Sequence, residues 1–166
     1  MSCKEVKIQE GHHSTRRLFK FGLGLNFNMR RLVIFKPSCD YSLPYPDYLD
    51  INKLFGFSDG FNHHKDSIRV GWRNNRVQQK IDLFHYQYID GKRVKEFLCG
   101  VGYDVPIEIS IEAKKSYHVT TVKGLDLHIE KLSGRRRRHW FHYFLYLYFG
   151  GNLVAPKDME VHICKL

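Results

Sequence analysis

The segment from Trp140 to Phe149, WFHYFLYLYF, constrains the fold more than any other part of the chain, because all but one of its residues are apolar or aromatic. A strand with one solvent-exposed face alternates polar and apolar residues, whereas a strand of this kind is covered on both faces or uses its second face to hold a ligand. That second face would carry Trp140, His142, Phe144, Tyr146 and Tyr148. The segment therefore predicts an aromatic-rich central strand of a β-sandwich.

Alternation and turn chemistry extend this prediction to the rest of the chain. Residues 106–112 alternate Ile with polar residues, which is typical of a half-buried strand. Asp90-Gly91 joins two alternating runs, residues 80–89 and 92–101, and this dipeptide strongly favours a two-residue hairpin turn. Residues 18–27 and 31–35 are expected to form a second hairpin around Asn26 and Asn28.

About ten or eleven strands are expected at the close spacing of a sandwich or barrel. No segment shows a sustained helical period with capping residues. We therefore predict an all-β fold, an antiparallel two-sheet β-sandwich of jelly-roll type, as a single domain over residues 1–166. At this length, a domain buries about 70% of the surface of its unfolded chain.

The charge balance indicates which partners the surface attracts. There are 27 Lys and Arg residues against 17 Asp and Glu residues, which gives a net charge of +10 at pH 7. Such a field attracts polyanions, namely nucleic acid, anionic lipid surfaces or acidic polysaccharide.

Neither the cysteines nor the N-terminus indicates an export route or a metal centre. Cys3, Cys39, Cys99 and Cys164 lie far apart without a C-x-x-C pair, and the spacing does not choose among the three ways of forming two disulfides. Buried or free thiols in a reducing compartment are the favoured interpretation. No signal peptide and no apolar stretch of membrane-spanning length is visible, so a cytoplasmic location without a membrane span is the default expectation.

Two passages resemble known proteins: DINKLFGFSDGFNHHKDSIRVGWR (residues 50–73) and YLYFGGNLVAPKDMEVHI (residues 146–163). They are similar to passages of uncharacterised bacterial proteins whose fold resembles the jelly roll of concanavalin-like lectins and glucanases. The resemblance covers about a quarter of the chain and implies two stacked antiparallel sheets with one concave face. Members of that fold bind or cleave carbohydrates, but a shared fold does not determine function.

A hydrolase hypothesis depends on Glu108 and Glu112. Glucanases of this fold carry a strand that reads E-x-D-x-E, but here Ser110 replaces the central Asp. Retaining hydrolases hold their two carboxyl groups about 5–5.5 Å apart, whereas positions i and i+4 of a regular strand lie roughly 13 Å apart. We therefore expect Glu108 and Glu112 to face solvent without forming a catalytic pair.

A lyase hypothesis uses a different set of residues. Polyuronate lyases of this fold have a Gln-x-His strand and a catalytic Tyr on an aromatic final strand, helped by Arg. This chain has the sequence His-Tyr-Gln, in which the His and the Gln stand in the opposite order to that of the lyases. It also has two tyrosines on the aromatic strand and two arginines on one face of another strand. These residues are His85, Gln87, Tyr146, Tyr148, Arg69 and Arg73.

Other motifs have ordinary interpretations. His63-His64 and Asp66 lack the spacing of a metal site, so hydrogen-bonded loop histidines are expected, with no metal and no cofactor. Four consecutive arginines, Arg135–Arg138, suggest a solvated turn or a phosphate-binding site. KFGLGLNF, residues 20–27, faintly resembles the RNA-binding octamer of RRM domains, but the helices of that fold are absent.

The sequence favours a non-catalytic binding or structural module over an enzyme, with carbohydrate as the expected ligand. The predicted ligand-binding residues are Arg69, Arg73, His85, Gln87, Tyr146 and Tyr148. Sugar CH faces stack on aromatic rings, while the polar groups bind hydroxyls or carboxylates. The alternative is a polysaccharide-active enzyme, a polyuronate lyase more than a glycoside hydrolase. Non-specific polyanion or nucleic-acid binding through the basic surface is the third hypothesis.

Overall fold

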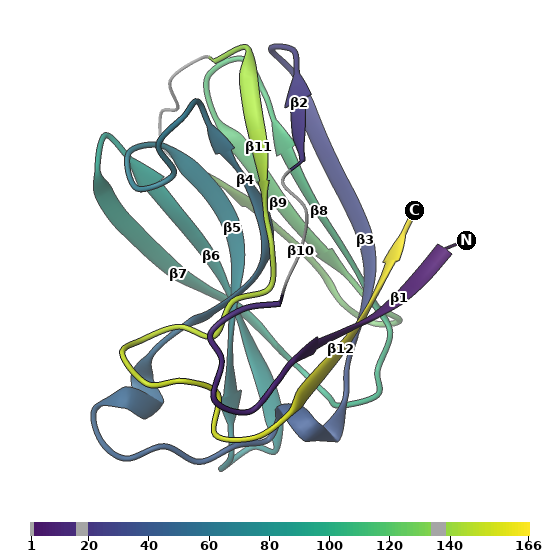
Figure 1. The fold of residues 1–166 in the computed structure, drawn as a ribbon. Helices are drawn as coiled ribbons and strands as arrows, with labels where there is room; N and C mark the ends of the chain where they lie inside the picture. The colour runs from purple at the N-terminus through teal and green to yellow at the C-terminus, as the bar shows by residue number, and fades with distance from the viewer. Residues whose placement is uncertain (1, 16–19, 134–138) are drawn as a thin grey trace.

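A computed structural model describes residues 2–15, 20–133 and 139–166 of the chain (Figure 1). These residues form two antiparallel sheets of six strands each, which stack as a sandwich. The only helices in the described ranges are two three-residue 3-10 turns, η1 (Pro37–Cys39) and η2 (Asp47–Leu49). The all-β two-sheet fold predicted from the sequence is confirmed.

The two sheets have the following strand orders. Sheet A consists of β1 (Ser2–Ile8), β12 (Met159–Lys165), β3 (Phe27–Phe35), β8 (Ile107–Ala113), β9 (His118–Lys123) and β10 (His128–Leu132). Sheet B consists of β2 (Phe21–Leu23), β11 (Phe141–Leu145), β4 (Asn52–Asp59), β5 (Ser67–Asn75), β6 (Lys80–Ile89) and β7 (Lys92–Val101). No helix in these ranges has the length and apolarity that crossing a bilayer would need.

The core lies between the sheets and explains the alternation in the sequence. On β5 of sheet B, Ile68, Val70 and Trp72 are fully buried. On β8 of sheet A, Ile109 and Ile111 are fully buried as well, and both sets belong to one apolar cluster. Because successive side chains of a strand point to opposite faces, the residues between them lie on the outer faces of the sheets.

The Asp90-Gly91 hairpin is confirmed as the connection of β6 and β7. These strands pair from Ile89 and Lys92 outward, and both turn residues have positive φ angles, 49° for Asp90 and 78° for Gly91. Two successive left-handed residues characterise a type I′ turn, whose twist matches that of the flanking strands.

The second predicted hairpin is wrong. β2 pairs with β11 in sheet B, whereas β3 pairs with β12 and β8 in sheet A. The segment around Asn26 is therefore a crossing between the sheets, and Asn28 belongs to β3 itself. Polar turn residues mark a change of direction, but they do not determine whether the next strand returns to the same sheet.

The aromatic segment forms a shorter and less central strand than predicted. β11 ends at Leu145 and lies next to the short edge strand β2. The described part of the aromatic segment that follows Leu145 forms isolated β-bridges, in which Tyr148 pairs with Ser14 and with Lys53. β9 was not anticipated, although its residues 119–122 are all buried.

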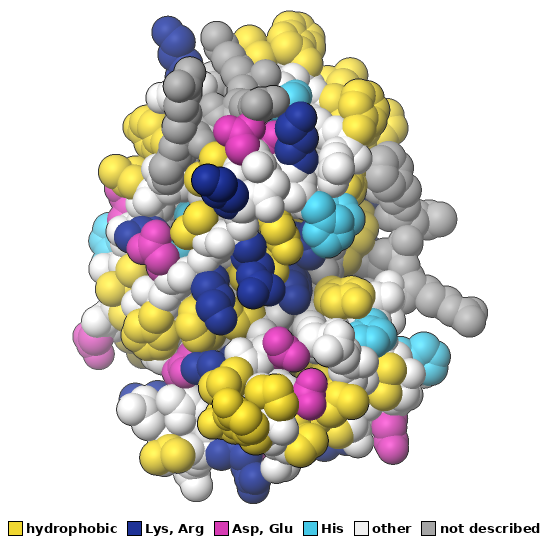
Figure 2. Space-filling model, turned by 90° about the vertical axis from the view of Figure 1, so that its left-hand side faces the viewer, with side chains coloured by type: hydrophobic (Ala, Val, Ile, Leu, Met, Phe, Trp, Pro, Cys, Tyr) yellow, Lys and Arg dark blue, Asp and Glu magenta, His cyan; other side chains and the backbone are white. Residues whose placement is uncertain are grey.

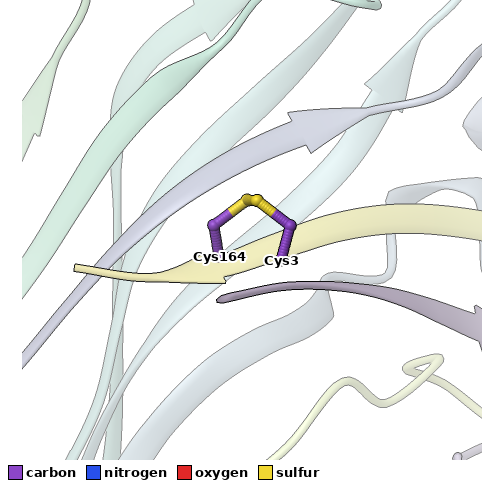
Figure 3. The surroundings of a disulfide bond; sticks show 2 residues. All are labelled: Cys3 and Cys164. Carbon is purple, nitrogen blue, oxygen red and sulfur yellow. A yellow bond between two sulfur atoms is a disulfide. The ribbon is translucent and has the colours of Figure 1, made fainter. Parts of the chain in front are cut away.

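The first and last strands are joined covalently, which contradicts the expectation of free thiols for this pair. β1 and β12 lie side by side near the chain termini (Figure 1), and Cys3 is the register partner of Cys164. The two sulfur atoms form a disulfide (Figure 3). Cys39 and Cys99 are buried and free, as expected. The Cys3–Cys164 pairing joins residues 161 positions apart, so local spacing could not indicate it.

The type I′ turn gives a direct stability test. Replacing Gly91 by Ala should lower the free energy of unfolding by about 1 kcal/mol, because a Cβ atom disfavours the left-handed conformation. No atom lies within 4 Å of the position that this Cβ would occupy, so steric overlap would not contribute. Gly124→Ala is the matched control, since that glycine is not left-handed. Urea unfolding measures both variants, and equal effects would contradict the turn geometry.

Candidate functional site

The outer face of sheet B carries a cavity of about 560 Å³ that combines cationic, aromatic and imidazole side chains. Figure 2 views this side of the molecule and shows Lys and Arg side chains gathered near its centre, next to hydrophobic and His side chains. We name it the basic cavity and define it by Lys53, His63, His64, Arg69, Tyr86, Tyr88, Arg93, Tyr146 and Tyr148. Its residues come from β4, β5, β6, β7, the loop after β4 and the segment after β11.

Arg69 lies at the centre of this cavity because of the alternation of β5. Its neighbours Ile68 and Val70 point into the core, so Arg69 points to the outer face. The residue is only 8% exposed, and its Nε atom is buried with no hydrogen-bond partner in the part of the chain that the structure describes. Burial lowers the pKa of the guanidinium, and the main groups that oppose this shift are tyrosines rather than a carboxylate. A buried cation without an anionic partner is costly, so this group is a strong candidate for anion binding.

Lys53 and Arg93 add positive charge on either side of Arg69. The Lys53 Nζ atom lies 5.2 Å from the centre of the Tyr86 ring and 5.8 Å from that of Tyr148. Burial, and then repulsion by Arg69, lower the pKa of Lys53 to about 8. Lys53 is therefore mostly protonated at pH 7 and loses its charge as the pH rises through about 8. Three cations and two rings thus surround one cavity.

His63, in the loop between β4 and β5, lines the cavity and is hydrogen-bonded to Tyr143 of β11. The Nδ1 atom of His63 lies 2.6 Å from the Tyr143 hydroxyl, which also accepts a hydrogen bond of 3.2 Å from the His63 backbone N–H. Burial, followed by the charge of Arg69, lowers the pKa of His63 to about 4, so the ring is neutral at pH 7. The His63 and His64 rings lie 4.2 Å apart rather than pointing oppositely, because the loop turns here. Hydrogen bonding of His63 was expected and is found.

Three of the six residues predicted to bind ligand line the basic cavity. Arg69, Tyr146 and Tyr148 do so, and neither tyrosine is fully buried. Tyr148 is 36% exposed and stacks on His13. Arg73 lies on the outer face as well, but near the far end of β5, where its guanidinium is 3.5 Å from Asp82 and packs over Phe84. Arg73 therefore shares the partly open sheet surface with Arg69, as predicted, but does not line the basic cavity.

The prediction that all six residues share one open surface is wrong for His85 and Gln87, which point into the interior. Both residues are 1% exposed and hydrogen-bond across the sandwich to β9. His85 Nδ1 lies 3.0 Å from the Thr120 hydroxyl, and Gln87 Nε2 lies 2.8 Å from His118 Nδ1. Burial lowers the pKa of His85, which favours the neutral ring. These side chains connect the sheets instead of facing a ligand.

The contacts of His85 and Gln87 continue through a buried carboxylate. Asp59 Oδ2 lies 2.7 Å from His118 Nε2, and its Oδ1 atom lies 3.0 Å from His142 Nδ1. The Nε2 atom of His142 donates a hydrogen bond of 2.8 Å to the carbonyl of Gly24. We name this row the interlayer polar chain; it consists of His142, Asp59, His118, Gln87, His85 and Thr120. It satisfies polar groups that would otherwise be costly inside an apolar core.

Glu108 and Glu112 do not form a catalytic pair. Glu108 pairs with Arg30 on β3 at 2.6 Å, and Glu112 pairs with Lys114. Both belong to β8 of sheet A, whereas the basic cavity belongs to sheet B. Arg135–Arg138 lie outside the described residues. Residues 20–27 do not form a continuous strand, since β2 covers only Phe21–Leu23.

Sequence reasoning missed Lys53, Tyr86, Tyr88, Arg93 and the Asp59 interactions. The sequence of β6 did contain one signal. Ile81, Leu83, His85 and Gln87 occupy alternate positions and therefore lie on one face of the strand. Because Ile81 and Leu83 are apolar and expected in the core, this face is expected to point inward. The same alternation places Tyr86 and Tyr88 on the outer face. By contrast, no local pattern indicates that His63 and Tyr143 meet.

No protein-family model matches the sequence, and no curated protein matches it. The fold is similar to that of an alginate lyase from Klebsiella pneumoniae, with a TM-score of 0.64, 8% identity and 82% of this chain covered. The chain spans only 56% of that lyase. A functionally unknown protein from Saccharomyces cerevisiae is similar as well, with a TM-score of 0.62 and 10% identity. The similarity extends over 97% of this chain and over 83% of the yeast protein.

A xylan β-1,4-xylosidase from Bacillus halodurans is also similar, with a TM-score of 0.50 and 8% identity. The similarity extends over 84% of this chain and over 27% of the xylosidase. At these identities the similarities establish the jelly-roll sandwich fold and nothing about activity. They agree with the fold that the sequence resemblance implied, and no sequence family accompanies it.

The isolated buried charge of Arg69 predicts a stability gain on its removal. Arg69→Met should leave the free energy of unfolding unchanged or raise it by about 1 kcal/mol, because the methionine keeps most of the apolar stem and removes an unpaired charge. Arg73→Met is the control on the same strand face, and it should destabilise the fold because it breaks the contact with Asp82. Thermal and urea unfolding measure both. A loss of more than about 2 kcal/mol in Arg69→Met would show that Arg69 has a structural role.

Proposed function

We propose that this protein is a binding module for an acidic polysaccharide, which it holds in the basic cavity on the outer face of sheet B. The observation that carries the proposal is Arg69, a nearly buried arginine that lines the cavity and has no carboxylate partner among the described residues. A uronate carboxylate has the charge and the planar geometry that an arginine binds best.

The surroundings of Arg69 support a sugar ligand rather than an isolated anion. Lys53 and Arg93 supply further positive charge, while Tyr148, which is 36% exposed, offers a ring face and a hydroxyl group. Sugar rings pack their CH faces on aromatic rings, and their hydroxyl groups hydrogen-bond to the polar tips. The carbohydrate-active enzymes among the structures with this fold make a glycan a plausible partner.

Binding of alginate, a polyuronate, should depend on Arg69 and on aromatic stacking. Arg69→Met should weaken affinity about tenfold or more through the lost charged hydrogen bond, and Tyr148→Ala should cost about 1 kcal/mol. Arg73→Met is the control, since Arg73 lies outside the cavity. Isothermal titration calorimetry at low and high salt is the measurement, with dextran as the neutral glycan and polyphosphate as a generic polyanion.

Two outcomes of that titration would contradict the proposal. Equal binding of alginate and polyphosphate, lost together at high salt, would leave only non-specific polyanion attraction. Unchanged affinity in Arg69→Met would remove the basic cavity as the binding site.

The pH dependence of alginate affinity should follow Lys53. Because the pKa of Lys53 is about 8 in the free protein, its charge is present below that pH and is lost above it. A uronate stays ionised throughout, so affinity should fall between pH 7 and about 9.5. Lys53→Arg should bind independently of pH over this window, and Lys53→Met should bind more weakly and also without pH dependence. A wild-type pH profile retained in Lys53→Met would contradict this assignment.

A second candidate function, a polyuronate lyase, is favoured by one specific observation. Neutral His63 is hydrogen-bonded to the Tyr143 hydroxyl, and the charge of Arg69 acts on both residues. In a β-elimination, Arg69 would neutralise the carboxylate and the pair would take the proton from the adjacent carbon. The electrons of that C–H bond form a C=C bond as the glycosidic C–O bond breaks, and the leaving oxygen is protonated.

Lyase activity would produce unsaturated uronate ends, which ultraviolet absorbance detects. If the pair is catalytic, Tyr143→Phe and His63→Ala should abolish product formation while alginate still binds. Binding by the wild-type protein without any unsaturated product would leave the non-catalytic module as the function.

A further inference from the structure

The outer face of sheet A carries a group of donor atoms at the junction of the first and last strands. Glu5, Glu160 and His162 each offer one ligand atom, and these atoms all lie within 4.8 Å of one another. His162 Nε2 and Glu160 Oε1 are 2.5 Å apart. The donors come from the two ends of the chain, so no local spacing in the sequence indicates them.

The register of β1 and β12 brings these side chains together. Glu5 is the register partner of His162, and Glu160 lies two residues from His162 on the same strand face. Val6 and Val161 point into the core and are 2% and 0% exposed. The three donors therefore occupy the opposite, solvent-accessible face of a paired and covalently linked strand pair.

We propose that Glu5, Glu160 and His162 form a Zn²⁺ site. Zn²⁺ binds imidazole nitrogen and carboxylate oxygen at about 2.0–2.2 Å, so its tetrahedral donors lie roughly 3.3 Å apart. In the proposed site, the exposed Glu5 and the half-buried Glu160 and His162 would move closer together around the ion, and a water molecule would complete four-coordination. Ca²⁺ and Mg²⁺ prefer six or more oxygen ligands, so an imidazole with two carboxylates favours zinc over both.

The neighbouring cations do not neutralise this group. Lys7 lies close to both glutamates, but its ammonium is paired with Asp158 at 2.6 Å. Lys36 lies near Glu160 and is paired with Asp104. Each lysine thus has its own carboxylate, and Glu5 and Glu160 keep a net negative charge for a divalent cation.

A metal ion at this position would act as a second cross-link between the chain ends. The Cys3–Cys164 disulfide occupies the register pair two positions before Glu5 and His162. The ion would therefore tie β1 to β12 independently of the disulfide. Ligands that bind only the folded state raise its stability by mass action, so zinc should raise the melting temperature.

The test uses the full chain with its disulfide intact, freed of metal with EDTA. Titration calorimetry with ZnCl₂ should show one ion per chain, and saturating zinc should raise the melting temperature by several degrees. His162→Gln and Glu5→Gln should each weaken zinc binding at least tenfold. Co²⁺ should give the visible absorption bands of a low-coordinate site, and excess Mg²⁺ should not compete.

β10 provides a matched control variant. His128 and Glu130 stand two residues apart on one exposed face of this strand, as Glu160 and His162 do, but no third donor joins them in the described ranges. His128→Gln should therefore leave zinc affinity unchanged. The proposal is overturned if no zinc binds, or if His128→Gln weakens binding as much as His162→Gln.

Discussion

The inward packing of β5 is the constraint on which the rest of the protein depends. Ile68, Val70 and Trp72 fill the centre of the core and are fully buried. Because successive side chains of a strand point to opposite faces, the residues between these three lie on the outer face of sheet B. This alternation places Arg69 on that outer face. The apolar core and the position of the buried arginine are thus two consequences of one alternation.

The interlayer polar chain complements this apolar packing. Asp59 contacts His118 and His142, and the contacts continue through Gln87 and His85 to sheet A. Apolar side chains attract without direction, whereas hydrogen bonds require particular partners at particular distances. The chain therefore restricts how β6 of one sheet can lie on β9 of the other, and it does so with the residues whose types suggested a ligand site.

The basic cavity gathers several positively charged side chains at one place on the outer face of sheet B. Arg69, Lys53 and Arg93 lie close together, and burial with mutual repulsion lowers the pKa of Lys53 to about 8. Such an arrangement costs folding free energy that a bound anion would recover. The gathering of positive charge on the outer face of sheet B is the observation on which the proposed binding of an acidic ligand rests.

The sequence determined the features that depend on neighbouring residues. Alternation in residues 106–112 and the Asp90-Gly91 turn predicted strands and a hairpin correctly, because side-chain parity and backbone φ are local properties. The one-domain organisation over residues 1–166 stays a prediction. Only the tertiary structure decided which strands lie next to one another, and hence that Lys53, Tyr86 and Arg93 line one cavity with Arg69. It likewise decided the Cys3–Cys164 pairing and the meeting of His63 with Tyr143, because contacts between distant residues depend on strand order and register, which no short segment contains.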